Sequence, residues 1–119
     1  MHSLKLALVA TCLVAAVVPA KAQNVGGKYS LAGKNFDGSP YTGTVQIAPS
    51  GSTCQMVWQT GGTTSEGLCM LSNKTLAAFY KLGSTFGLVI YELQPNGSLI
   101  GQWTIVGKYG VGAEVLTPQ

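Results

Sequence analysis

Residues 52–71 read STCQMVWQTGGTTSEGLCML, two cysteine-bearing runs on either side of a glycine pair. Gly61-Gly62 suits the centre of a two-residue hairpin turn, because both central residues of a type I′ turn need positive φ. Counting outward from this turn places Cys54 directly opposite Cys69. The stretch therefore predicts an antiparallel hairpin whose two cysteines face each other.

The N-terminus has the pattern of a secretory signal peptide. Lys5 precedes an apolar run over residues 6–18, and the small-residue site Ala20-Lys21-Ala22 follows it. The run is shorter than the roughly 20 residues that span a bilayer, which disfavours the alternative of an uncleaved membrane anchor. We predict that residues 1–22 are the signal peptide and that residues 23–119 form a single domain, periplasmic or secreted.

Export makes a disulfide the favoured state of the two remaining cysteines. Thiols of exported proteins are usually oxidised, and opposed residues of a hairpin lie about 5.5 Å apart, within disulfide reach. We predict a Cys54–Cys69 disulfide. The alternatives are two buried free thiols, or a bulge near Ser65 or Gly67 that changes the register.

The composition of the mature chain excludes several function classes. Residues 23–119 contain no histidine, no arginine and two cysteines, and five lysines oppose four carboxylates, for a net charge of +1. These residues provide no Ser-His or Cys-His pair, no imidazole metal site and no four-cysteine zinc site. Without arginine there is no bidentate reader of phosphate or guanine. We expect no enzyme activity, no metal or other cofactor, and no nucleic-acid partner.

The rest of the mature chain consists of short apolar or alternating runs separated by turn residues, and no run has a helical period. Segments such as Asp37-Gly38-Ser39-Pro40 and Pro95-Asn96-Gly97 are typical of turns. The fold class is therefore all-β. The eight expected strands cover residues 27–32, 41–48, 53–59, 63–71, 75–81, 85–93, 98–106 and 110–117.

Eight sequential strands joined by tight turns form a meander, and they close most simply into an antiparallel up-and-down β-barrel. The alternative is a small open sheet or a sandwich. Alternation places Trp58 on the inner face. A two-residue turn at Asn96-Gly97 would pair Ile90 with Trp103. We therefore expect Trp58 and Trp103 to fill the interior beside the disulfide.

A transmembrane barrel is the rival all-β architecture. It needs a continuous apolar outer band. The outward positions that alternation assigns are polar, so we expect no membrane insertion after signal cleavage; these positions are Thr42, Thr44, Gln46, Gln55, Gln59, Gln102 and Thr104.

Glu114 and three tyrosines are the remaining candidates for a functional site. Glu114 has inward parity among apolar neighbours, so desolvation is expected to raise its pKa. We interpret it as a core carboxylate hydrogen-bonded to a tyrosine, a tryptophan or the backbone. Tyr29, Tyr91 and Tyr109 could form a binding surface, because aromatic side chains are enriched at interfaces. They could equally be ordinary strand residues.

Four segments carry a resemblance to known proteins: NFDGSPYTGTVQIA at 35–48, MVWQTGG at 56–62, YELQPNGSLIGQWTIVG at 91–107 and GVGAEVLTP at 110–118. In these segments the chain resembles small exported alphaproteobacterial proteins labelled fibronectin-binding protein. The shared motifs are turns, glycines and core tryptophans, which imply a shared fold. The label implies adhesion to fibronectin or another host protein.

We therefore expect an exported, monomeric, non-enzymatic binding protein with a protein partner. One alternative is an inhibitor of a protease or lysozyme, which would present a loop from residues 34–40 or 107–111. The other is a small-ligand carrier, which requires an unfilled barrel. A cavity of about 300 Å³ or more beside Trp58 and Trp103 would favour the carrier.

Overall fold

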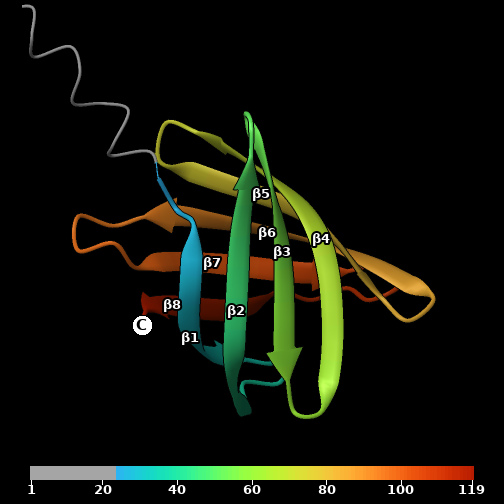
Figure 1. The fold of residues 1–119 in the computed structure, drawn as a ribbon. Coiled ribbons are helices and arrows are strands. Elements are labelled where there is room, and N and C mark those ends of the chain that lie inside the picture. Colours follow the sequence, from blue (N-terminus) through green and yellow to red (C-terminus); the bar gives the residue numbers. More distant parts are fainter. Residues whose placement is uncertain (1–23) are drawn as a thin grey trace, which may run out of the picture.

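The computed structural model describes residues 24–119, which form eight antiparallel strands (Figure 1). Each strand pairs with the next, and β1 pairs with β8, so the sheet closes into a barrel. The predicted eight-stranded meander barrel is confirmed, and every strand boundary lies within two residues of its expected position. The strands are β1 (Gly27–Lys34), β2 (Pro40–Ser50), β3 (Thr53–Thr60), β4 (Thr63–Ser72), β5 (Thr75–Leu82), β6 (Thr85–Leu93), β7 (Leu99–Ile105) and β8 (Gly112–Pro118).

The predicted signal peptide, residues 1–22, lies outside the residues that the structure describes. Within residues 24–119 no helix is long and apolar enough to cross a membrane. In Figure 1, β1, β2 and β3 lie in front of β6, β7 and β8 and cross them at a steep angle.

The β3–β4 hairpin has the register that the glycine pair predicts. Gly61 and Gly62 adopt φ values of 53° and 82°, in the left-handed region that favours glycine. Cys54 lies opposite Cys69 with a Cα–Cα separation of 4.9 Å, and the two form a disulfide. The predicted pairing and the predicted bridge are both confirmed.

The β6–β7 pairing differs by one residue from the prediction. Trp103 lies opposite Val89 rather than Ile90. Since neighbouring residues of a strand point to opposite faces, the shift exchanges the inner and outer sets of β6. Val89 and Tyr91 are buried inside the barrel, and Ile90 is exposed on its outer surface.

The cause of this shift is the length of the β6–β7 turn. The Gln94 backbone N–H donates to the Ser98 carbonyl (2.8 Å), and the Gly97 N–H donates to the Gln94 carbonyl (2.9 Å). Asn96 Oδ1 accepts from the backbone N–H of Ser98 (3.0 Å). The loop therefore spans residues 94–98, and Asn96-Gly97 is part of a longer turn than the two-residue one expected.

One half of the barrel interior is packed. It adjoins the β2–β3, β4–β5 and β6–β7 turns, where Val25 is also buried and accepts a hydrogen bond at its carbonyl from the Tyr29 hydroxyl (2.6 Å). The Cys54–Cys69 disulfide belongs to this half. The other fully buried side chains here include Ile47, Met56, Leu76, Tyr91, Leu99 and Leu116.

The outer surface is less polar than expected. The polar outward positions of the sequence analysis lie on β2, β3 and β7. In contrast, β4, β5 and β6 carry apolar residues on both faces, so alternation of polar and apolar residues does not identify their outward face. Leu68, Phe79 and Leu88 are cross-strand neighbours and each is about half exposed. Exposed apolar patches of this kind are typical of interaction surfaces.

Candidate ligand cavity

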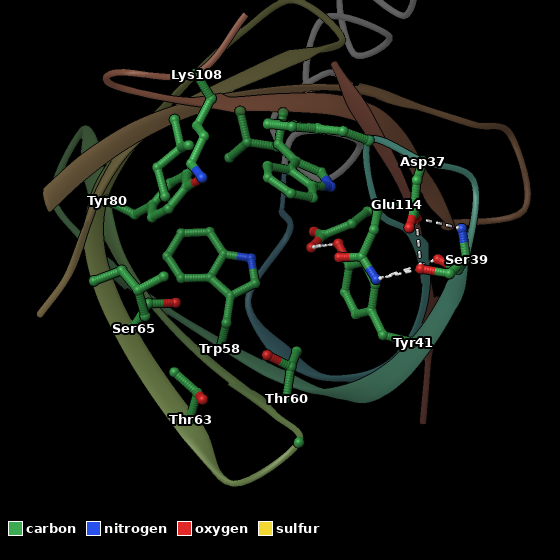
Figure 2. Close-up of a pocket in the computed structure, with 17 residues that line it drawn as sticks. Asp37, Ser39, Tyr41, Trp58, Thr60, Thr63, Ser65, Tyr80, Lys108 and Glu114 are labelled. Carbon is green, nitrogen blue, oxygen red and sulfur yellow. Dashed lines mark hydrogen bonds between the residues drawn. The ribbon is translucent and has the colours of Figure 1, made fainter. Parts of the chain in front are cut away.

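The second half of the barrel interior is hollow. A cavity of about 650 Å³ opens at the end bordered by the β1–β2, β3–β4 and β7–β8 loops. Figure 2 shows side chains from opposite walls pointing into it. Its lining combines aromatic and polar side chains; it includes Phe36, Tyr41, Trp58, Tyr80 and Trp103 together with Ser65, Lys108 and Glu114.

Small residues at inward positions explain the space. Around this end, the inner face of the barrel is built largely from residues that place few or no side-chain atoms in the interior. In the packed half, many inward positions carry larger side chains, such as Ile47, Met56 and Leu116. The small inward residues of the hollow half are Gly33, Gly43, Gly67, Gly87, Gly112, Thr60, Thr63 and Ser65.

The inward glycines also hold aromatic rings against the wall. A Cβ on Gly112 would overlap ring atoms of Trp103, and a Cβ on Gly87 would overlap the ring of Tyr80. Each ring therefore lies directly on strand backbone and lines the cavity without crossing it. Trp58 is buried and Trp103 is half-buried, but together they do not fill the interior as expected.

Glu114 lies at the base of the cavity within a hydrogen-bonded cluster. Its Oε1 accepts from the Tyr91 hydroxyl (2.6 Å). Its Oε2 accepts from the Tyr41 hydroxyl (2.7 Å), and Figure 2 shows this second bond. The Tyr91 hydroxyl in turn accepts from the Trp58 indole N–H (3.0 Å). Only 7% of Glu114 is exposed. Glu114 is thus a buried carboxylate bonded to tyrosine, one of the three kinds of partner expected for it.

Burial dominates the electrostatics of this cluster. It raises the pKa of Glu114, and the hydrogen bonds from Tyr91 and Tyr41 partly oppose that rise because they stabilise the carboxylate. Burial is the larger cause and the negative charge of Glu114 the smaller one in raising the pKa of Tyr80 to about 12. The same two causes raise the pKa values of Tyr41 and Tyr91 well above the usual value of 10. The tyrosine hydroxyls therefore keep their protons at neutral pH.

Two of the loops at the rim of the cavity, β1–β2 and β7–β8, are the candidate inhibitory loops of the sequence analysis. Phe36 in the β1–β2 loop stacks on Trp103 with ring centroids 4.8 Å apart. Asp37 accepts from the Ser39 hydroxyl and backbone N–H, and both bonds lower the pKa of Asp37. Lys108 in the β7–β8 loop is exposed beside the opening.

The three candidate surface tyrosines do not form one surface. Tyr29 and Tyr91 point into the barrel and are only 4% and 0% exposed. The inward direction of Tyr91 was missed because the β6–β7 turn is longer than expected, which shifts the register of β6. Tyr109 is fully exposed in the β7–β8 loop. Tyr80 lines the cavity and was not among the candidates; its inward parity with the buried Leu76 is the signal that could have found it.

Among residues 24–119 no three His, Cys, Asp or Glu side chains gather closely enough to hold a metal ion.

No family model and no curated protein matches the chain. Similar folds do occur among solved structures. A redesigned β-barrel, mFAP1, bound to DFHBI superposes with a TM-score of 0.67 at 18% identity, covering 79% of this chain and 95% of that chain. A Schistosoma mansoni fatty acid binding protein in complex with arachidonic acid has a TM-score of 0.54 at 12% identity, covering 82% and 98%. The REP1-NXSQ fatty acid transporter has a TM-score of 0.53 at 14% identity, covering 80% and 96%.

At these identities the similarity shows a shared fold. The chain is an eight-stranded closed meander barrel of the same architecture as barrels that bind small molecules. The fibronectin partner implied by the sequence resemblance receives no support from these comparisons and stays a prediction.

Proposed function

We propose that the protein is a binding protein that holds a small, largely apolar molecule inside the open half of its barrel. The observation that carries this proposal is the cavity of about 650 Å³ beside Trp58 and Trp103. Its size lies within the range of about 300–1,000 Å³ typical of small-molecule sites, and its mainly apolar lining surface is also typical. The carrier, one of the two alternatives left open by the sequence, thus becomes the favoured function.

The structural neighbours support a ligand inside the barrel. The names of two of them state a fatty acid as cargo or ligand, and a third binds DFHBI. All three share the closed fold with this chain, although their sequences are too different to transfer a ligand.

The remaining expectations belong to the same proposal. The pattern of residues 1–22 and the Cys54–Cys69 disulfide support an exported protein, because disulfides persist in oxidising compartments. The absence of histidine and arginine from residues 23–119 supports a non-enzymatic role. A protein partner, including fibronectin, would have to use the outer surface or the rim loops.

Titration with N-phenyl-1-naphthylamine, an uncharged apolar fluorophore, tests the proposal. Trp58 and Trp103 are the two tryptophans of the sequence and both line the cavity, so a bound fluorophore should quench their emission by energy transfer. We expect saturable binding with one site per chain. A linear, non-saturating signal would overturn the proposed function.

A matched pair of variants places the fluorophore. Ser65 is an inward lining residue of β4, and Thr64 is its exposed outward neighbour. Ser65→Phe would fill part of the cavity, and we expect it to weaken binding about tenfold or more, since the lost volume excludes the fluorophore. Thr64→Phe adds the same ring outside and should bind like the wild type. Equal affinity of both variants would place the fluorophore elsewhere and contradict the proposal.

A further inference from the structure

The polar groups at the base of the cavity are hydrogen-bond acceptors. Glu114 is a carboxylate with two oxygens, each of which accepts one hydrogen bond from a tyrosine and retains a further lone pair. The Tyr41 hydroxyl donates its hydrogen bond to Glu114, and the Tyr80 hydroxyl donates its hydrogen bond to the Thr104 carbonyl (2.9 Å). Both hydroxyl oxygens can still accept. A donating ligand group that reaches this depth therefore finds several acceptors.

Donors line the cavity as well, because the hydroxyls of Thr60, Thr63 and Ser65 can donate as well as accept, but none of them is charged. The indole N–H of Trp103 has no hydrogen-bond partner among residues 24–119, and its nitrogen is covered and lies close to Gly112. The indole N–H of Trp58 is already bonded to Tyr91.

The charged groups of the cavity lie at two depths, at the exposed rim and at the buried base. Its rim carries one group of each sign, Asp37 and Lys108, both exposed to water, where their attraction for a ligand is weak. Its base carries Glu114, which is nearly buried and whose hydrogen-bond partners in the described chain are tyrosine hydroxyls. A ligand carboxylate placed at this depth would meet a buried carboxylate and no compensating cation.

The rings around Glu114 favour a cation. Tyr41, Tyr80, Trp58 and Trp103 line the same space as the carboxylate, and Figure 2 shows Trp58 and Tyr41 on opposite sides of it. Aromatic faces attract ammonium groups, most strongly where water is excluded. A carboxylate among such faces also supplies the charged partner that a buried ammonium requires.

We propose, on the basis of the proposed function, that the cavity takes an apolar or aromatic molecule carrying a cationic amine, and that the amine lies at Glu114 between the aromatic rings. The cargo class would then differ from the anionic fatty acids named for two of the structural neighbours. The structural neighbours share the barrel fold with this chain, but the charge of an accepted ligand depends on the side chains at the base of each cavity.

Three probes with the same ring system test this inference: naphthylethylamine, naphthylethanol and naphthylacetic acid. Their affinities for the folded protein are measured at neutral pH by calorimetry and by displacement of N-phenyl-1-naphthylamine. We expect the amine to bind about tenfold or more tightly than the alcohol, because its hydrogen bonds to Glu114 are charge-assisted, and the acid to bind most weakly. Equal affinities for amine and alcohol, or tighter binding of the acid, would overturn the inference.

Two carboxylate variants add an internal control. Glu114→Gln retains the shape of the side chain and removes its charge, and we expect it to abolish the preference for the amine over the alcohol. Glu66→Gln removes an exposed carboxylate from the outside of β4 and should retain that preference. If Glu114→Gln does not fold, the wild-type comparison of the three probes still decides.

The uncharged fluorophore separates the two proposals. If it binds with saturation but the amine has no preference, the cavity is a ligand site and the inference about charge is wrong. If neither the fluorophore nor any naphthyl probe binds, the proposed function itself is wrong.

Discussion

The Tyr91 hydroxyl on β6 donates a 2.6 Å hydrogen bond to Oε1 of Glu114 on β8, although β7 lies between these strands in the sheet. The same hydroxyl accepts from the Trp58 indole N–H on β3. One buried side chain thus joins opposite walls of the barrel at the boundary between its packed half and its hollow half.

Tyr91→Phe should destabilise the protein by about 1–3 kcal/mol, because the variant leaves the Trp58 N–H without an acceptor and Glu114 Oε1 without a donor. The free energy of unfolding in urea measures this loss. Tyr109→Phe removes the hydroxyl of an exposed tyrosine and should change stability by less than about 0.5 kcal/mol. Equal stability of the two variants would mean that the cluster contributes no net stabilisation.

Glu114 should make stability fall as the pH rises. Its folded pKa is raised above the ordinary value of 4.5, chiefly by burial, so in the window between 4.5 and the folded pKa the folded chain binds more protons than the unfolded chain. This stabilising contribution is fully present below that window and is lost as the pH rises through it. Urea unfolding at a series of pH values measures the dependence.

Glu114→Gln should lack the pH dependence in that window, while Glu66→Gln should retain it. Asp37 does not confuse the measurement, because its pKa is lowered from 3.8 by the hydrogen bonds of Ser39, and its effect falls at more acidic pH with the opposite sign. Identical profiles for the wild type and Glu114→Gln would contradict the assignment.

Reduction of the disulfide should lower the free energy of unfolding by about 3 kcal/mol. Cys54 and Cys69 are 15 residues apart, and the chain-entropy estimate for a loop of this length gives about that value. Urea midpoints with and without a phosphine reductant provide the measurement. Thiol counting under denaturing conditions is the control, and two reactive thiols in the unreduced protein would contradict the bridge.

Gly112→Ala should both destabilise the barrel and weaken binding of the fluorophore. The new Cβ would overlap the Trp103 ring, which has to move toward the cavity, and overpacking of this kind costs about 1–3 kcal/mol. Ala113→Ser alters the next, outward position of the same strand and is the matched control. A Gly112→Ala protein with wild-type stability and affinity would show that the ring is not held against the strand.

Much of the architecture could be predicted because it depends on local signals. The Gly61-Gly62 turn set the register of β3 and β4, and alternation then placed Trp58 inside and Cys54 opposite Cys69. The same reasoning was wrong for β6 and β7, since Asn96 bonds within a five-residue loop instead of a two-residue turn. The resulting shift of one residue in the register exchanged the two faces of a strand and concealed Tyr91.

The ligand cavity could not be predicted in the same way. The sequence indicated that Trp58 and Trp103 point inward, but inward-pointing rings can either fill a barrel or line it. The outcome depends on which residue of a neighbouring strand each ring meets, as Trp103 meets Gly112. Such pairings follow from the closure of the barrel and have no local signal.

The sequence by itself determined the all-β class, the number and order of the strands, the disulfide pair and the inward position of Glu114, because turn chemistry and alternation act over a few residues. Only the tertiary structure decided that the interior is half hollow, that Tyr41 and Tyr91 both bond Glu114, and that rim loops surround an opening. Those features depend on the volume left when eight strands close, which is a property of all the inward side chains together.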